Sequence, residues 1–213
     1  STNYSNRFKI MKKITFIFLI FFFISGLSYS KTINSIHKGT YNLSDKYIVV
    51  TNFNMDDVMK VMEEENFGNM EAFKELLSET NIGDANIEYI FNPDTIDTDG
   101  SNINIISQNI GDIGDLKLNN STMKEICSMS EDYFSQIWAQ KISFAECKKS
   151  NTVPKGAIGW FILAKNIAGF DIYQFNSIYK NGFNIIVTLT CAPIKCREWN
   201  SDHIKIVRTF KRN

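Results

Sequence analysis

Apolar and polar side chains alternate most clearly in the last third of the chain. Between Phe183 and Thr190 every second residue is Phe, Ile, Val or Leu, which is typical of a strand with one buried face. The dipeptide Asn181-Gly182 before it favours a type I′ hairpin turn, because both residues tolerate the positive φ of that turn. The pattern predicts a meander of four antiparallel strands at Lys141 to Glu146, Ala157 to Lys165, Asp171 to Tyr179 and Phe183 to Thr190.

Elsewhere the apolar residues recur every three to four positions, which predicts four amphipathic helices. The first two lie between residues 54 and 77, and the first carries a methionine-rich stripe. The third begins at a capping box formed by Thr122 and Glu125. Its expected buried stripe is Met123, Ile126, Cys127, Phe134, Ile137 and Trp138. The fourth begins at a Ser201 cap.

Four shorter strands precede the meander, at Tyr41 to Leu43, Tyr47 to Asn52, Asn86 to Phe91 and Ile103 to Gln108. The polar segment 31–39 is expected to be irregular. The order is then strands, two helices, a hairpin, a helix, four strands and a last helix. This order predicts an α+β fold, an antiparallel sheet with helices packed on its faces as an α/β/α sandwich.

Residues 11–30 have the three-part pattern of a secretory signal peptide. A charged start at Met11-Lys12-Lys13 is followed by the apolar run from Ile14 to Ile24. Ser28 and Ser30 supply the small residues at −3 and −1 of a cleavage site after Ser30. The alternative is an uncleaved anchor, but the run is well short of the ~20 apolar residues that span a bilayer.

The charges balance over the whole chain but not along it. The chain has 23 Lys and Arg and 23 Asp and Glu, and residues 1–30 hold four of the basic residues and none of the acidic ones. Residues 31–213 therefore carry a net charge of −4, which gives no electrostatic case for binding nucleic acid or an anionic membrane. We interpret residues 1–10 as translated upstream sequence and 31–213 as a single exported domain, periplasmic or secreted.

All four cysteines lie after the leader, and an exported chain with an even number of cysteines normally forms disulfides. Three connectivities are possible. We favour Cys191–Cys196, which closes a short loop, and Cys127–Cys147, which ties the third helix to the next strand. A zinc site or a redox pair would need Cys-x2-Cys spacing or nearby histidines, and the sequence has neither. No metal or cofactor is expected.

The acidic loop from Asn92 to Asn102 contains Asp97-Thr98-Asp99-Gly100, which is similar to the middle of an EF-hand. With Gly100 at loop position 6, Thr95 and Ile106 occupy the positions of the first and last calcium ligands. Neither side chain replaces the carboxylate that belongs there. A solvated turn is the preferred interpretation.

Motifs that signal catalysis are absent from the sequence. It has no glycine-rich phosphate loop and no nucleophile or zinc-protease motif. His203, beside Asp202, is expected on the surface of a helix. The alternative function is a small exported hydrolase of unrecognised type with His203 or His37 as its base. Either histidine in a concave pocket with a carboxylate and a hydroxyl within reach would favour that alternative.

The stretch from Lys141 to Phe210 resembles the PsbP-like family. The resemblance rests on the meander running into a terminal helix that ends Ile206-Val207-Arg208-Thr209-Phe210-Lys211. This family includes the extrinsic subunit of photosystem II and many exported bacterial proteins. The resemblance implies an antiparallel sheet covered by helices, and it brings no set of catalytic residues.

These observations favour a non-catalytic binding or accessory domain whose partner is an unknown protein or small ligand. Tyr and Trp that remain exposed are favoured anchors for a partner. The candidates on or beside the meander are Trp160, Tyr173, Tyr179 and Trp199.

The signal-peptide interpretation predicts that the exported protein begins at Lys31. Intact-mass measurement of the protein recovered from the exporting cell checks this, because cleavage removes residues 11–30. A mass that retains those residues would identify an anchor instead.

Overall fold

The computed structural model describes residues 30–51, 56, 60, 87–95 and 100–213. The chain divides into two compact units, Ser1–Ser30 and Lys31–Asn213, and the fold below is that of the second. The predicted leader, most of the first two predicted helices and the centre of the acidic loop lie outside the described residues.

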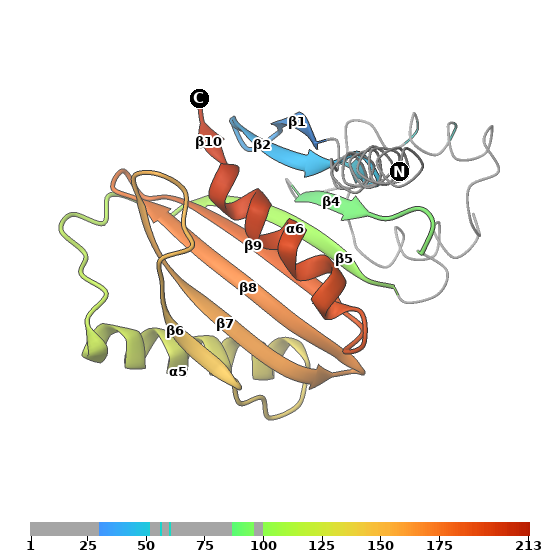
Figure 1. Ribbon diagram of the computed structural model, residues 1–213. Helices are drawn as coiled ribbons and strands as arrows, with labels where there is room; N and C mark the ends of the chain where they lie inside the picture. The colour runs from blue at the N-terminus through green and yellow to red at the C-terminus, as the bar shows by residue number, and fades with distance from the viewer. Residues whose placement is uncertain (1–29, 52–55, 57–59, 61–86, 96–99) are drawn as a thin grey trace, which may run out of the picture. The chain divides into compact units, whose positions relative to one another are not determined.

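An antiparallel sheet of seven strands organises the domain (Figure 1). Its order is β3-β4-β5-β9-β8-β7-β6, and each neighbouring pair is antiparallel. A smaller sheet has the order β1-β2-β10. The strands are β1 (Ser30–Ser35), β2 (Gly39–Ser44), β3 (Ile48–Val50), β4 (Ile87–Phe91), β5 (Asn102–Asn109), β6 (Glu146–Ser150), β7 (Ala157–Ile167), β8 (Phe170–Tyr179), β9 (Phe183–Cys191) and β10 (Lys211–Arg212).

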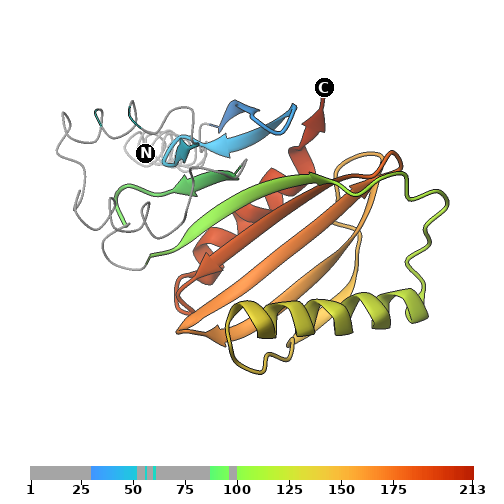
Figure 2. The same ribbon diagram turned by 180° about the vertical axis from the view of Figure 1, so that it is seen from behind.

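A helix lies on each face of the large sheet. Helix α6 (Cys196–Thr209) buries Trp199 and Ile206 against the face that carries Val187 of β9. Helix α5 (Asn120–Ile137) runs along the opposite face, as Figure 2 shows, and packs Phe134 against a smaller core that contains Ile172. The predicted α+β sandwich is therefore confirmed.

Several element boundaries differ from the prediction. The segment 31–39 is not irregular, because β1 occupies its first half. The strand expected at 141–146 begins only at Glu146. The backbone N–H groups of Ile142 and Phe144 instead donate to α5, to Ser135 Oγ at 2.9 Å and to Glu131 Oε1 at 2.7 Å. These bonds hold the segment against the helix rather than in a sheet.

The two described helices start earlier than predicted. Helix α5 is capped by Asn119, whose Oδ1 accepts from the backbone N–H of Thr122 at 3.0 Å, so the capping-box prediction was wrong. Helix α6 begins at Cys196 rather than after Ser201. It adds more than one turn, and that turn brings Trp199 into the core.

The hairpin between β8 and β9 forms at the predicted dipeptide but with a different turn. The N–H of Gly182 donates to the carbonyl of Tyr179 at 2.8 Å, and Gly182 has a φ of 77°. Asn181 is not among the residues with positive φ. This is a three-residue loop closed by a left-handed glycine, not a type I′ turn. A Cβ at Gly182 would also collide with the backbone of Gly111.

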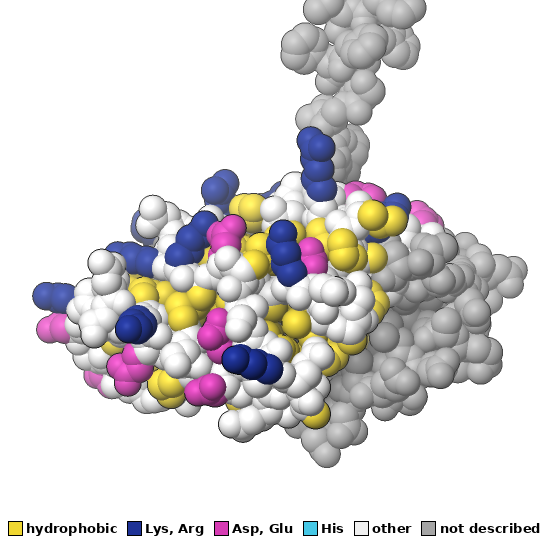
Figure 3. All heavy atoms as spheres, turned by 90° about the horizontal axis from the view of Figure 1, so that it is seen from below, with side chains coloured by type: hydrophobic (Ala, Val, Ile, Leu, Met, Phe, Trp, Pro, Cys, Tyr) yellow, Lys and Arg dark blue, Asp and Glu magenta, His cyan; other side chains and the backbone are white. Residues whose placement is uncertain are grey.

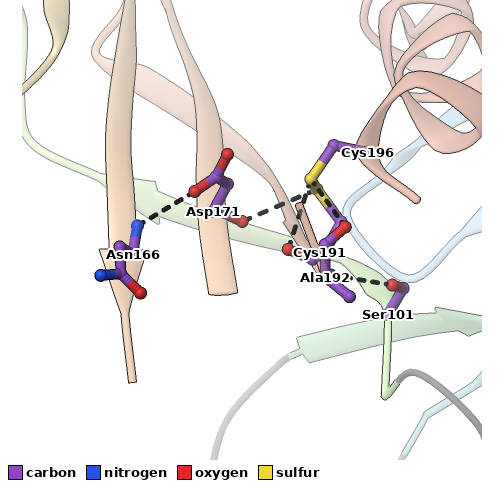
Figure 4. The surroundings of a disulfide bond; sticks show 6 residues. All are labelled: Ser101, Asn166, Asp171, Cys191, Ala192 and Cys196. Atoms are coloured by element: carbon purple, nitrogen blue, oxygen red, sulfur yellow. Dashed lines mark hydrogen bonds between the residues drawn. A yellow bond between two sulfur atoms is a disulfide. The ribbon is translucent and has the colours of Figure 1, made fainter. Parts of the chain in front are cut away.

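The four cysteines lie in the two expected pairs at bonding distance. Cys127 of α5 and Cys147 of β6 have a Cα–Cα distance of 5.8 Å, and both are half-buried. Cys191 and Cys196 have a Cα–Cα distance of 5.1 Å and are buried where β9 turns into α6 (Figure 4). The first pair fixes α5 to the edge strand β6, and the second joins β9 to the other helix.

Replacing Cys127 and Cys147 together by Ala should lower the free energy of unfolding by about 3 kcal/mol, because the cross-link no longer restricts the unfolded chain. Urea denaturation measures the change. Ser128→Ala, at the exposed neighbour on the same helix, should leave the midpoint unchanged. A loss below about 1 kcal/mol would show that this pair does not anchor α5.

Candidate functional site

Helix α5 exposes a row of large apolar side chains. Met129, Tyr133, Ile137 and Trp138 are 64%, 62%, 58% and 40% exposed. The prediction that Ile137 and Trp138 are buried was therefore wrong. The Cys127 tether and the packing of Phe134 on Phe144 turn the other side of the helix toward the sheet. Large apolar side chains that gather at one exposed place mark an interaction site.

This row forms one wall of a groove between α5 and the sheet, with a volume of about 520 Å³. Figure 3, which views the molecule from the side on which α5 runs, shows apolar patches separated by scattered charged groups. The wall comes from α5 and the floor from β5, β8 and β9. The lining residues are Met129, Ser130, Tyr133, Phe134, Ile137, Trp138, Ile106, Gln174, Asn176, Ile186 and Thr188.

Among the described residues, none of the side chains that line this groove is charged. Other hollows of the domain differ: one contains Lys155, Lys211 and Arg212, and another contains Lys124 and Glu131. A charged group bound in the α5 groove would lose water without gaining an opposite charge, which is costly. The groove is therefore suited to an uncharged molecule.

The polar side chains on the floor form a hydrogen-bonded chain across β9 and β8. Thr188 Oγ1 donates to Gln174 Oε1 at 3.4 Å, and Gln174 Nε2 donates to Asn176 Oδ1 at 3.2 Å. Asn176 is 4% exposed, and its Nδ2 has no partner within the described part of the chain. A buried donor without a partner costs about 1–3 kcal/mol, so its place in the floor of the groove requires an explanation.

Comparison with known proteins bears on the fold. No family model matches the chain, and no curated protein matches it. Among solved structures, the solution structure of cyanobacterial PsbP (CyanoP) from Synechocystis sp. PCC 6803 matches with a TM-score of 0.55. The match covers 88% of this chain and 95% of that one at 9% sequence identity. The fold is PsbP-like. The structural resemblance expected from the meander and its terminal helix is thus confirmed, and at this identity it extends to the fold alone.

The PsbP-like fold does not bring the four predicted aromatic residues together. Trp199 is 1% exposed and packs 4.9 Å from Tyr47 beneath α6. Tyr173 and Tyr179 are half-buried on the α6 side of the sheet, and Trp160 lies on the other side in register with Asn176. No single surface contains all four.

The exposed aromatic residues of the groove, Tyr133 and Trp138, were missed as binding candidates. The sequence does contain a signal for them. Helix α5 carries more large apolar residues than one buried face needs, since Met129, Tyr133 and Ile137 form a row separate from Met123 and Phe134. Such an excess indicates a second contact surface.

His203 is a core residue of α6 and not a surface residue as predicted. It is 0% exposed, its Nε2 donates to the carbonyl of Val187 at 3.0 Å, and its ring centre lies 5.1 Å from that of Phe175. Burial lowers its pKa to about 4, so the ring is neutral near pH 7. His203 shares the buried face of α6 with Trp199, four residues before it, and with Ile206 and Val207.

His37 is also buried and held by polar contacts. Its Nδ1 accepts from Ser107 Oγ at 2.8 Å, its Nε2 donates to the carbonyl of Ile105 at 2.9 Å, and burial lowers its pKa. The nearby carboxyl of Glu88 accepts from Ser35 Oγ at 3.0 Å rather than from the ring, and burial raises its pKa. Neither histidine lines the groove.

Two negative findings apply to the described residues. They contain no group of three or more His, Cys, Asp or Glu side chains placed to hold a metal ion. They also contain no helix that is both long and apolar enough to cross a membrane.

The buried imidazole of His203 predicts that the domain loses stability in acid. With a pKa of about 4 when folded and about 6.5 when unfolded, the unfolded chain binds a proton first as the pH falls. The contribution of His203 is fully present above pH ~6.5 and decreases by about 3 kcal/mol as the pH falls toward 4. Urea denaturation at a series of pH values measures this.

The matched variant is His203→Leu, which has no titrating group at this position. Its free energy of unfolding should depend less on pH between 7 and 4 than that of the wild type, although His37 adds to the same trend and Glu88 opposes it. Equal slopes for the two proteins would contradict the assignment.

Proposed function

We propose that this chain is an exported, non-catalytic binding domain that holds a small ligand in the groove between α5 and the sheet. The observation that carries the proposal is the apolar wall of α5, exposed beside a floor of uncharged polar groups. The volume of about 520 Å³ lies within the range of small-molecule sites.

The energetics of the wall support a binding role. A helix that only stabilised the sheet would place polar residues on its solvent side. Here Tyr133 and Ile137 are more than half exposed at that side. Tyr and Trp combine a large apolar surface with few rotatable bonds, and they therefore anchor ligands at low entropic cost.

The chemistry of the polar groups in the groove supports binding over catalysis. These groups are the amides of Gln174 and Asn176 and the hydroxyl of Thr188 in the floor, and the hydroxyl of Ser130 on α5. None of these groups titrates near neutral pH, so none serves as a general acid or base. The two histidines that the hydrolase alternative requires are buried elsewhere. An accessory role also agrees with the PsbP-like family, which includes an extrinsic subunit and has no set of catalytic residues.

Export is supported by two independent features. The first is the signal-peptide pattern of residues 11–30. The second is the pairing of all four cysteines, since disulfides persist in oxidising compartments such as the periplasm or the extracellular space.

The binding proposal predicts where small molecules attach. In amide NMR titrations with a mixture of uncharged fragments, shift changes should cluster on residues 129–138 of α5 and on the facing parts of β8 and β9. Replacing Tyr133 and Ile137 together by Ser removes two anchors and should weaken binding by about tenfold or more. The recovered fragments should be chemically unchanged.

The matched control is the pair Ile110→Ser and Ile194→Ser, which removes exposed apolar side chains outside the groove. It should leave fragment affinity as it is. Shift changes that cluster elsewhere, or conversion of a fragment to a product, would overturn the proposal.

A further inference from the structure

We propose that the groove takes an uncharged, mainly apolar molecule that carries a hydrogen-bond acceptor, such as a ketone, ester or amide carbonyl, and that Asn176 is the donor to it. This inference rests on the proposed function, because it concerns the same groove and names the class of ligand.

The apolar part of the ligand follows from the lining. Seven of the eleven lining residues are Ile, Met, Phe, Tyr or Trp, and they lie on both sides of the groove. Ile106 and Ile186 are opposite each other in neighbouring strands and form an apolar strip in the floor beneath the α5 wall. A molecule between them buries apolar surface on two sides, which contributes roughly 25 cal/mol per Å².

The uncharged head group of the ligand follows from the absence of charge in the lining. A fatty acid or a sulfonate would need a cation or a helix end to replace its water, and the lining offers neither a Lys nor an Arg. The amide and hydroxyl groups of the floor pair with uncharged polar atoms. A neutral head group therefore fits this groove better than an ionic one.

The acceptor follows from the direction of the hydrogen-bonded chain. Thr188 donates to Gln174 and Gln174 donates to Asn176, so the oxygen of each amide already accepts one hydrogen bond. The chain ends at Asn176 Nδ2, which has two hydrogens and no acceptor in the described structure. An oxygen from the ligand completes the chain.

A ligand reaches this donor through a local adjustment of the Asn176 side chain. Asn176 lines the groove, while its Nδ2 is shielded from solvent. The terminal torsion of Asn has a broad energy minimum, so small adjustments of the amide toward a ligand that keep the bond from Gln174 cost little. Formation of the bond removes the cost of the unpaired donor, which makes the gain on binding larger than for an exposed amide.

Three naphthalene probes test the proposal by fluorescence titration of the purified domain. Prodan is uncharged and has a ketone, dimethylaminonaphthalene lacks the ketone, and anilinonaphthalene sulfonate carries a negative charge. Prodan should bind about tenfold more tightly than either of the others. Its bound emission should show the red shift of a hydrogen-bonded carbonyl.

The decisive variant is Asn176→Leu, which keeps the volume but removes the donor. It should weaken Prodan binding about five- to tenfold, shift the bound emission to the blue and leave dimethylaminonaphthalene unaffected. Asn184→Leu is the matched control, because Asn184 is also buried on this side of the sheet but does not line the groove. If Asn176→Leu does not fold, the preference of the wild-type domain for Prodan over dimethylaminonaphthalene still tests the acceptor.

The outcomes separate the ligand class from the proposed function. Suppose that the probes with and without the ketone bind equally well and that the Tyr133→Ser and Ile137→Ser variant binds neither. This result would overturn the claim that the ligand needs an acceptor, but the groove would remain a binding site. Preference for the sulfonate would overturn the neutral class. Prodan binding that is unchanged in Asn176→Leu but lost in Asn184→Leu would show that the donor is not Asn176 and would also overturn the inference.

Discussion

The separation of β9 into two faces is the constraint on which the rest of the domain depends. Ile185, Val187 and Leu189 are almost fully buried on one face, where they form the main core with α6. Because one face of the central strands already supplies this core, the other face does not have to be uniformly apolar. Thr188, in the middle of the same strand, can therefore carry a hydroxyl on the α5 side.

The orientation of α5 follows from its contacts with that second face. The disulfide from Cys127, together with the bonds from Glu131 and Ser135 to the segment after the helix, fixes which side of α5 meets the protein. The row of Met129, Tyr133 and Ile137 is then left outward. The groove results from two elements that each keep one surface uncovered, an amphipathic helix and a mixed sheet face.

The strands of the meander were predictable because alternation depends only on neighbouring residues and on which face is buried. The rotation of α5 was not predictable, since apolar residues occur around about half of the helix and its contacts come from distant segments. Thr122 was a plausible cap by local pattern, but Asn119 caps the helix three residues earlier and accepts from the N–H of Thr122 itself. The Nδ2 of Asn176, without a partner in the described part of the chain, depends on side chains from two strands, so no local pattern reveals it.

The disulfide between Cys127 and Cys147 also makes the position of α5 depend on the redox state of the compartment. In a reducing compartment the two thiols would stay reduced, and α5 would be held to β6 by non-covalent contacts alone. Without the covalent bond, no cross-link fixes the wall of the groove at a constant distance from the floor. Oxidation fixes α5 to β6, so under the proposed export the wall of the groove would be set in place only in the oxidising compartment.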